Sequence, residues 1–299
     1  MAKSRCIRRH LDDGPGTRRL LRHRALLELT VEVRHAVKDA ARLNDELQIL
    51  HTGGTLRKER LMSEIKALVH DVFGTVVDWR GAVTGDGEEL GRKNGITSVD
   101  WQEFADQWRG LYAPSMNKVR TGELPWTNLD ALHRMALDQL LDKYGIAGKL
   151  SEDDKVWFNL TWHRLKPWPD SVPGLTRIKR KFIIATLSNG TVRLLTDMGK
   201  HCGLPWDTVL GSDIVRAYKP DAAMYQSAIE FLGSGDPGAV MMTAAHNNDL
   251  VAASKHGMKT AYVNRPYEHG AKQSRDFKAE HDFTYVAESF EDLATQLGC

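Results

Sequence analysis

The sequence predicts an α/β fold, a doubly wound parallel sheet with a helical segment inserted after the first strand. Short apolar runs typical of buried parallel strands alternate with helical segments in the second half of the chain. Such repeated alternation implies a parallel sheet with right-handed crossovers. Between about residues 80 and 166 the chain lacks strand-like runs and shows helical spacings instead. The predicted strands cover residues 67–69, 181–188, 239–244 and 260–263.

The first predicted strand ends close to an acidic residue. Ala67, Leu68 and Val69 are apolar on consecutive positions, as expected when both faces of a strand are covered, and the run breaks at Asp71 and Gly74. Ligands of open α/β sheets bind beyond the carboxyl ends of the strands. A carboxylate placed there can attack an electrophile and carry a covalent ester. The alternative is that Asp71 only caps the following turn or helix.

The segment after the first strand is predicted to be helical. Apolar residues recur at spacings of three and four over residues 99–112 and 126–144, and Ser151 with the acidic residues after it has the pattern of a helix start. We expect residues 81–165 to form a helical cap over the carboxyl edge of the sheet. The core then comprises residues 62–80 and 166–299.

The composition is that of an ordinary soluble globular protein, with 41% hydrophobic and 27% charged residues among 299. No apolar run approaches the roughly 20 residues needed to span a bilayer, so no membrane association is expected. Cys6, Cys202 and Cys299 are widely separated and form no CxxC pair, which argues against a disulfide framework and a zinc site. A cytoplasmic, reducing location fits this best.

The first 61 residues differ from the rest in charge. They carry 14 Lys+Arg against 8 Asp+Glu, a net of +6, so the remainder has a net charge of −4. This argues against nucleic-acid binding by the main body, which would need a basic stripe on the folded domain. Residues 1–61 have three interpretations: an accessory helical segment, a targeting peptide, or upstream sequence before a true start at Met62. We favour the last because Met62 leads directly into the first strand, so this basic extension need not belong to the native fold.

Polar side chains follow other predicted strands or lie in loops near them. Ser188 and Asn189 follow one strand, Lys219 lies in a loop, and Asp249 comes shortly after another strand. Each has a structural alternative, with Ser188 or Asp249 as a helix cap and Lys219 as a surface charge. Their joint occurrence predicts a site beside Asp71, at the carboxyl edge of the sheet.

These residues resemble, in order and context, the four motifs of the haloacid dehalogenase superfamily, and in particular its L-2-haloacid dehalogenase branch. The motifs are Asp71-Val-Phe-Gly-Thr75, Ser188-Asn-Gly190, Lys219-Pro220 and Asp249. The resemblance covers about residues 66–290. It implies a Rossmann-like core, a helical cap inserted after the first strand, and Asp71 as the nucleophile. It also implies supporting roles for Thr75, Ser188, Asn189, Lys219, Tyr225 and Asp249.

The first motif separates dehalogenases from ester phosphatases. In phosphatases of the superfamily the first motif has the pattern Asp-x-Asp, and its second acid protonates the leaving alkoxide. In this chain that position is Phe73. A halide leaves without a proton. Magnesium prefers oxygen ligands in octahedral array, and the motifs offer only Asp71 and Asp249, so we expect neither a metal nor a cofactor. Phosphonate-cleaving relatives also lack the second Asp, so Phe73 does not exclude all phosphoryl chemistry.

The resemblance implies hydrolytic dehalogenation of short-chain 2-haloalkanoic acids to 2-hydroxy acids. Asp71 would attack C2 with inversion, expel halide and form an ester, which water then hydrolyses at the Asp71 carbonyl. Lys219 would keep the nucleophile ionised, because a nearby cation lowers the pKa of a carboxylate.

Other residues are expected to bind the substrate. Ser188 and Asn189 would receive the substrate carboxylate or the departing halide. The cap should add an arginine, which we expect to be Arg120, with Arg109 as the alternative; surface exposure would be the plain interpretation of either. Further substrate-site residues are expected to be Val72, Phe73, Trp126 and Tyr225.

The last motif departs from the better-known pattern. Where many L-2-haloacid dehalogenases show Ser-Ser-Asn-x-x-Asp, this chain has Ala244-Ala245-His246-Asn247-Asn248-Asp249. Histidine acts as a general base near neutral pH, so His246 with Asp249 is a candidate for activating the hydrolytic water. The alternative is that His246 only forms local hydrogen bonds or orients Asp249.

Two other functions stay open. A related hydrolase could act on a phosphonate, phosphate or strained-ring substrate, and a non-catalytic relative could act as a binding module through the basic extension. The second is weaker because nucleophile, hydroxyl, lysine and distal acid are all present. The expected partners are a small 2-haloacid and water, without nucleic acid or membrane, and a homodimer is left open.

Overall fold

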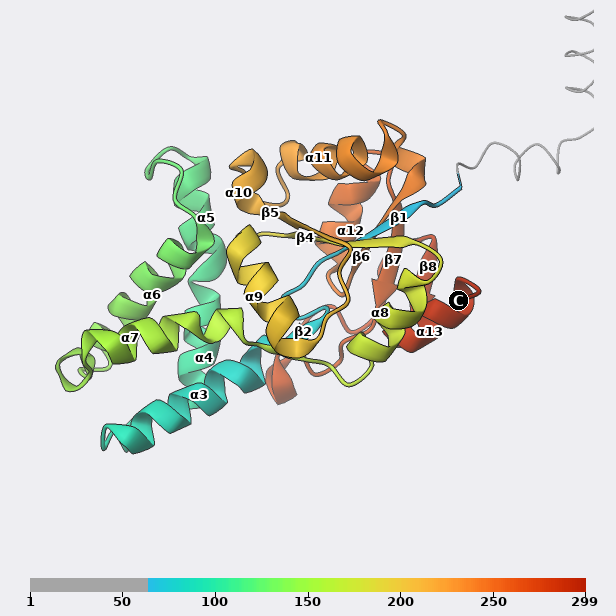
Figure 1. Ribbon diagram of the computed structural model, residues 1–299. Helices are drawn as coiled ribbons and strands as arrows, with labels where there is room; N and C mark the ends of the chain where they lie inside the picture. Colours follow the sequence, from blue (N-terminus) through green and yellow to red (C-terminus); the bar gives the residue numbers. More distant parts are fainter. Residues whose placement is uncertain (1–63) are drawn as a thin grey trace, which may run out of the picture. The chain divides into compact units, whose positions relative to one another are not determined.

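The described part of the chain is built on a six-stranded parallel sheet. The computed structural model describes residues 64–299, so the predictions for residues 1–61 and for a start at Met62 lie outside the described residues. The strand order is β5-β4-β1-β6-β7-β8, and all neighbours are parallel (Figure 1). This confirms the predicted fold class. The strands are β1 (Ala67–His70), β4 (Ile183–Ser188), β5 (Thr208–Gly211), β6 (Val240–Ala244), β7 (Lys259–Val263) and β8 (Tyr285–Ala287).

Strand β1 lies in the middle of the sheet, between β4 and β6. His70 is in register with Thr186 of β4 and Thr243 of β6. Leu68 packs into one hydrophobic cluster and Val69 into another, which explains why β1 is apolar on consecutive positions. The chain segments that leave β1, β4 and β6 at their carboxyl ends therefore emerge side by side.

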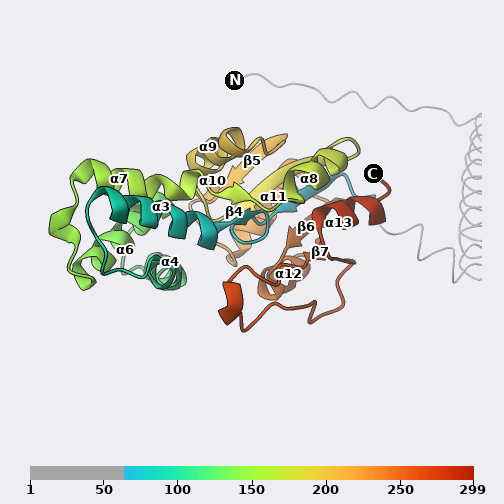
Figure 2. The same cartoon turned by 90° about the horizontal axis from the view of Figure 1, so that it is seen from below.

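Helices flank the sheet (Figures 1 and 2). They are α8 (Ser171–Lys179), α9 (Val192–Cys202), the short α10 (Ser212–Val215), α11 (Ala222–Gly233), α12 (Asn247–Ser254) and α13 (Phe290–Gln296). Helices α8, α9 and α13 contribute side chains to the cluster that contains Leu68, whereas α11 and α12 contribute to the cluster that contains Val69. Both faces of the sheet are thus covered, as in a doubly wound fold.

A block of helices follows β1, where the insertion was predicted. It consists of α3 (Trp79–Lys93), α4 (Trp101–Gly110), α5 (Tyr112–Arg120), α6 (Leu129–Lys143) and α7 (Glu152–Asn159), which lie to one side of the sheet (Figure 1). The chain enters the block through β2 (Val77–Asp78) and leaves it through β3 (Lys166–Pro167), and these two segments pair antiparallel. They border the predicted cap, residues 81–165, whose limits stay a prediction. No helix within residues 64–299 is long and apolar enough to cross a membrane.

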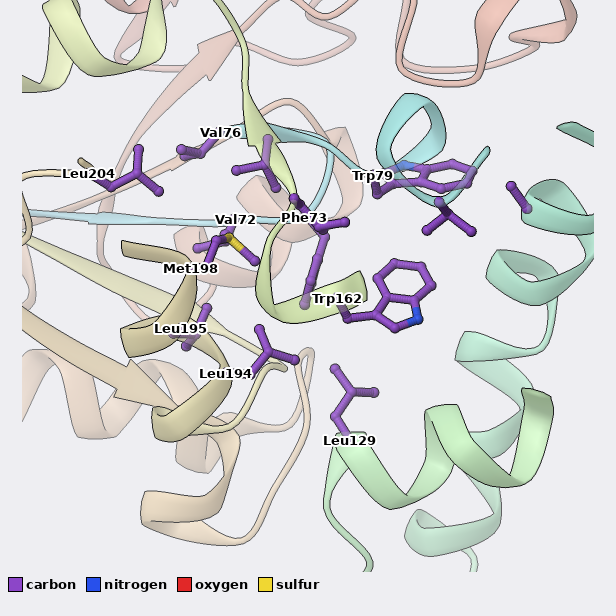
Figure 3. Packing of buried hydrophobic residues seen from close by; sticks show 14 of the residues in the cluster. Val72, Phe73, Val76, Trp79, Leu129, Trp162, Leu194, Leu195, Met198 and Leu204 are labelled. Atoms are coloured by element: carbon purple, nitrogen blue, oxygen red, sulfur yellow. The ribbon is translucent and has the colours of Figure 1, made fainter. Parts of the chain in front are cut away.

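One hydrophobic cluster joins the sheet to the helical block. Figure 3 shows Phe73, just beyond β1, beside Trp162, with Leu129 of α6 and Leu194 of α9 directed toward the same region. The ring centroids of Phe73 and Trp162 are 5.9 Å apart in an edge-to-face arrangement, which is a favoured geometry for aromatic pairs. The helical block therefore packs directly against the turn that carries Asp71.

Several elements were not assigned from the sequence, and α3 illustrates the reason. Its four glycines lower the helix propensity of the segment and hide its pattern. Two of them serve packing, since a Cβ at Gly87 would lie 2.5 Å from a ring atom of Trp101, and one at Gly91 would lie 2.8 Å from another. Strands β5 and β8 were missed because runs of four and three residues are too short to show periodicity.

Candidate active site

Asp71 is the first residue after β1 and is almost buried, at 7% exposed. Its backbone N–H donates to the carbonyl of Thr243 at 2.9 Å, which continues the pairing with β6. The Thr75 hydroxyl donates to Asp71 Oδ2 at 2.8 Å, and the same hydroxyl oxygen accepts from the backbone N–H of Ala245 at 2.9 Å. The turn between Asp71 and Thr75 passes through Gly74, whose φ of +85° favours glycine. The Asp71 carboxylate is therefore held by Thr75 of its own turn, and that turn is bonded to the segment that follows β6.

Lys219 bridges two carboxylates at the centre of the site. Its Nζ lies 2.8 Å from Asp71 Oδ1 and also forms a close ion pair with Asp249. The Tyr225 hydroxyl donates to the other Asp249 oxygen at 2.7 Å. The backbone N–H of Lys219 donates to the side-chain oxygen of Asn189 at 2.6 Å, which fixes the loop that carries the lysine. The structure thus brings together five of the predicted residues.

The charges of this group stabilise one another. Burial alone would raise the pKa of Asp71, but the ammonium of Lys219 and the hydrogen bond from His246 hold that pKa well below its usual value. Burial alone would lower the pKa of Lys219, but Asp249 and Asp71 raise it above its usual value. Asp71 is therefore an ionised carboxylate at neutral pH.

His246 lies between Asp71 and the buried Glu268, which was not predicted from the sequence. Its Nδ1 is 3.1 Å from Asp71 Oδ2, and its Nε2 is 2.9 Å from Glu268 Oε2. Glu268 is 1% exposed, and its other oxygen accepts from the indole N–H of Trp79 at 3.0 Å. Burial would lower the pKa of His246, yet the charge of Glu268 and the bonds to both carboxylates raise it well above its usual value. Since both ring nitrogens face carboxylates, both donate, and the ring is an imidazolium.

This arrangement differs from the predicted pairing of His246 with Asp249. The two Asp249 oxygens are bonded to Lys219 and Tyr225, while the imidazole is bonded to Asp71 and Glu268. A protonated imidazole has no lone pair with which to accept a proton from water. The general-base role for His246 stays a prediction, and the resting structure gives it no support.

Glu268 carried one sequence signal. It lies five residues beyond the end of β7, and polar residues at or beyond the carboxyl ends of β1, β4 and β6 had already been used to predict the site. The distance along the chain from β7, together with the absence of a recognised motif there, left this residue unassigned.

Ser188 and Asn189 lie at the end of β4, as predicted. The Ser188 hydroxyl is buried and accepts from the backbone N–H of Gly190 at 3.2 Å. Burial raises the pKa of Tyr112, and the positive charge of Arg109 and a hydrogen bond from Asn189 partly offset this rise. Tyr112, from the start of α5, therefore faces the site, whereas the sequence predicted only that it belongs to a helix.

The site is bordered on the side of the helical block by an aromatic wall, which consists of the rings of Phe73, Tyr112, His133 and Trp162. Phe73 lies 6.3 Å from Tyr112, 6.4 Å from His133 and 5.9 Å from Trp162 between ring centroids. Burial lowers the pKa of His133 to about 3, so this histidine is neutral and belongs to the wall. Val72 is buried in the same cluster. The result is an apolar surface next to an ionised carboxylate.

The two candidate arginines occupy different surroundings. Arg120 forms an ion pair with Asp221 at 2.8 Å and donates to the carbonyl of Lys219 at 2.6 Å, so it braces the lysine loop from outside. Arg109 instead lies over the ring of Tyr112 at 4.1 Å and 5.9 Å from the centre of Phe73. Its Nη1 is buried and has no hydrogen-bond partner within residues 64–299. The geometry therefore favours Arg109 over Arg120 as the anion-binding residue.

Trp126 packs against the segment that precedes Lys219. Its ring packs 5.1 Å from the ring of Tyr218, whose hydroxyl donates to the carbonyl of Thr127 at 2.6 Å. This contact joins the helical block to the loop before Lys219. The expected role of Trp126 as a substrate-site residue stays a prediction.

A cavity lies close to Glu268, and a lysine side chain lies at the centre of the site. The cavity, of about 470 Å³, is lined by residues that include Trp79 and Arg109, and the Trp79 indole N–H donates to Glu268. Among the described residues, no group of three or more His, Cys, Asp and Glu side chains is arranged to hold a metal ion. The two central acids are instead bridged by the Lys219 ammonium.

Comparisons with known proteins agree with this geometry. The family profile of the haloacid dehalogenase-like hydrolases matches residues 65–257. (S)-2-haloacid dehalogenase 4A of Burkholderia cepacia is 27% identical over 208 residues, which cover 69% of this chain and 85% of that protein. (S)-2-haloacid dehalogenase of Pseudomonas sp. strain YL is 26% identical over 207 residues, covering 68% of this chain and 84% of its own length.

Two solved structures are more similar in sequence. The crystal structure of a defluorinating L-2-haloacid dehalogenase is 43% identical, with a TM-score of 0.76, and the match covers 79% of this chain and 96% of that one. A second L-2-haloacid dehalogenase is 42% identical, with a TM-score of 0.75, over 78% of this chain and 99% of its own. The chain belongs to the haloacid dehalogenase-like hydrolases, in the branch of the L-2-haloacid dehalogenases.

Proposed function

We propose that this enzyme hydrolyses short-chain L-2-haloalkanoic acids to 2-hydroxy acids through an ester on Asp71, with inversion at C2. The observation that carries the proposal is an ionised, nearly buried Asp71 with Phe73 where a phosphatase would have its proton donor. An ionised carboxylate can attack carbon and carry a covalent ester, and a halide leaves without a proton. The names of the two solved relatives support the same reaction.

The hydrogen bonds of Asp71 distinguish its two oxygens. Oδ2 has two partners, the Thr75 hydroxyl and His246 Nδ1, whereas Oδ1 has the single partner Lys219. We assign the attack on C2 to Oδ1, which has a lone pair left for the substrate. The remaining partners then hold the carboxylate plane while the new bond forms.

The anionic parts of the substrate need positive partners. Arg109 offers a buried donor without a partner in the described part of the chain, next to the aromatic wall. We assign it to the departing halide or the substrate carboxylate, together with the Asn189 amide group. A buried guanidinium donor without a partner is costly, so binding of an anionic substrate group or halide to Arg109 is favoured.

We also propose that the reaction needs no metal. The position between Asp71 and Asp249, where a divalent cation would bind in an Asp-rich site, is taken by the Lys219 ammonium. The lysine supplies the positive charge that a metal would otherwise contribute.

The test uses both enantiomers of 2-chloropropionate with excess chelator and detection of chloride. We expect chloride from the L enantiomer only, and none with Asp71→Asn. A single turnover in heavy-oxygen water should place the label in the Asp71 peptide, because water attacks the aspartyl carbonyl. Label that appears only in the hydroxy acid would indicate direct attack by water on C2, and a requirement for magnesium would point to a phosphonate or phosphate substrate.

A further inference from the structure

We infer that His246 acts as a protonated donor to the oxyanion that forms on Asp71 Oδ2 during ester hydrolysis, and that Glu268 keeps it protonated through the reaction. The inference rests on the proposed function, because it concerns the second step of that reaction. It makes Glu268 a positioning residue for His246 and assigns to His246 a role opposite to that of a general base.

The first argument is the fate of each oxygen of Asp71. If Oδ1 forms the bond to C2, Oδ2 becomes the carbonyl oxygen of the ester. Attack by water on Cγ then places the negative charge on Oδ2. Preorganised donors aimed at the atom where charge develops are a major source of catalysis.

Oδ2 already has two such donors. The Thr75 hydroxyl lies 2.8 Å away, and because its oxygen accepts from the backbone N–H of Ala245, its proton is directed toward Asp71. The second donor is His246 Nδ1, at 3.1 Å from Oδ2. Together they form an oxyanion site that exists before the ester does.

Glu268 is placed to hold the charge on the ring throughout the cycle. When Asp71 is alkylated it loses its negative charge, and His246 loses one of its two anionic partners. The remaining anionic partner is Glu268, which lies 2.9 Å from Nε2 and is 1% exposed. The indole N–H of Trp79 fixes its second oxygen.

Other charged groups near the pair help to keep Glu268 ionised. Burial alone would raise the pKa of Glu268, but the charge of His246 and its hydrogen bond lower it most, and the nearby Arg109 and His269 lower it further. The resulting pKa is about 2. Lys219 and Asp249 form a neutral pair on the far side of Asp71. Glu268 therefore stays ionised and is the anion on which the imidazolium depends after alkylation.

The proposed hydrolysis balances without a proton from His246. Water forms a bond to Cγ, one water proton passes to the Asp249 carboxylate, and the π electrons of the carbonyl move onto Oδ2. As the oxyanion collapses, the Cγ–Oδ1 bond breaks, and the leaving alkoxide takes the proton held by Asp249. The regenerated Asp71 acid then releases its proton to solvent and returns to its ion pair with Lys219.

Donor and base roles predict opposite pH dependence for ester hydrolysis. If the imidazolium is required, the hydrolysis rate falls as pH rises through the pKa of His246. If neutral imidazole is required, the rate falls as pH drops. Glu268→Gln removes the anion but keeps a hydrogen-bonding side chain, so it should shift the alkaline fall to lower pH by at least one unit.

The experiment is a rapid-quench single turnover with L-2-chloropropionate that follows chloride and hydroxy acid separately. In His246→Gln we expect chloride release to persist while hydroxy-acid formation slows by roughly 10²- to 10³-fold, with ester accumulating on the Asp71 peptide. Glu268→Gln should behave like the parent at low pH and accumulate ester at high pH. Glu291→Gln, the same change at an exposed position of α13, is the matched control.

Three results would overturn the inference. One is hydroxy-acid formation at the parent rate in both variants, another is a fall in hydrolysis toward acid pH that disappears in His246→Gln, and the third is equal slowing of chloride and hydroxy acid. If Glu268→Gln does not fold, as judged by circular dichroism, the pH profile of the parent and the His246→Gln data still decide. Absence of chloride from the parent itself would instead refute the proposed function.

Discussion

Gly74 lies so close to the Glu268 carboxylate that any side chain at position 74 would collide with it. A Cβ at position 74 would lie 2.1 Å from Oε1 of Glu268, and the φ of Gly74 is +85°. The glycine of the first motif thus has a second use besides forming the turn after Asp71. It makes room for the carboxylate that binds His246.

We expect Gly74→Ala to damage the site by displacing Glu268. The strained backbone and the clash should lower the free energy of unfolding by roughly 1–3 kcal/mol, and hydroxy-acid formation should slow more than halide release. Gly85→Ala is the control, because a Cβ at Gly85 in α3 meets nothing within 4 Å, so it should stabilise the helix by up to about 1 kcal/mol. Urea denaturation and single-turnover assays measure both effects, and equal behaviour of the two variants would contradict this prediction.

Lys219→Met should leave two buried carboxylates without their shared cation. We expect a loss of roughly 3–5 kcal/mol in the free energy of unfolding, because an uncompensated buried charge is costly. The pKa of Asp71 should rise, since Lys219 is the main group that lowers it against burial, so halide release at neutral pH should fall. Lys200→Met, at an exposed position of α9, should change neither quantity. Parent-like halide release by Lys219→Met would show that the lysine does not activate the nucleophile.

Arg109→Met should weaken substrate binding or halide departure. The loss of a charged hydrogen bond predicts a roughly 10- to 100-fold fall in kcat/KM for L-2-chloropropionate. Arg92→Met removes a positive charge from the exposed end of α3 and should leave kcat/KM as in the parent. Steady-state kinetics on the two variants test the assignment, and an unchanged kcat/KM for Arg109→Met would return Arg120 to consideration.

Two buried histidines should make the fold sensitive to acid. Burial lowers the pKa of His70 and of His133 to about 3 in the folded state, whereas the unfolded chain takes up these protons near pH 6.5. Their contribution to stability is therefore complete above pH 6.5 and is lost as pH falls from there toward 3. At pH 4.5 each should cost about 2–3 kcal/mol relative to pH 7.

Replacing one of these histidines by an apolar ring should reduce that acid sensitivity. We expect His133→Phe, which keeps a ring beside Trp162, to lose less stability than the parent between pH 7 and pH 4.5. Urea denaturation at the two pH values measures the difference. An identical loss in parent and variant would mean that folding does not lower the pKa of His133.

Most of the fold was predictable because its strongest signals are local. The apolar run before Asp71 and the strand and helix alternation after residue 166 identified a doubly wound sheet. The helical spacings between them identified the inserted block. What remained hidden was α3, where packing against Trp101 requires glycines that oppose helix propensity, and the shortest strands.

The residues of the site that could be predicted are those that belong to recognisable motifs at or after the ends of strands. Asp71, Lys219, Asp249 and Tyr225 were named from the sequence and lie in one hydrogen-bonded group. Glu268 was missed because its role depends on a tertiary contact with His246. The choice between Arg120 and Arg109 depended likewise on which helix face meets Phe73, and no single sequence position shows that.

The placement of β1 between two partner strands has a consequence for the lifetime of the assembled site. Amide hydrogens of the central strand should exchange with solvent only when the whole sheet opens, whereas Glu268 belongs to residues 264–284, which contain no strand and a single short turn of 3₁₀ helix. Exchange there should be governed by local opening. The reacting carboxylate is therefore attached to the part of the described chain that opens last, and the carboxylate that sets the charge of His246 is attached to a part that opens earlier.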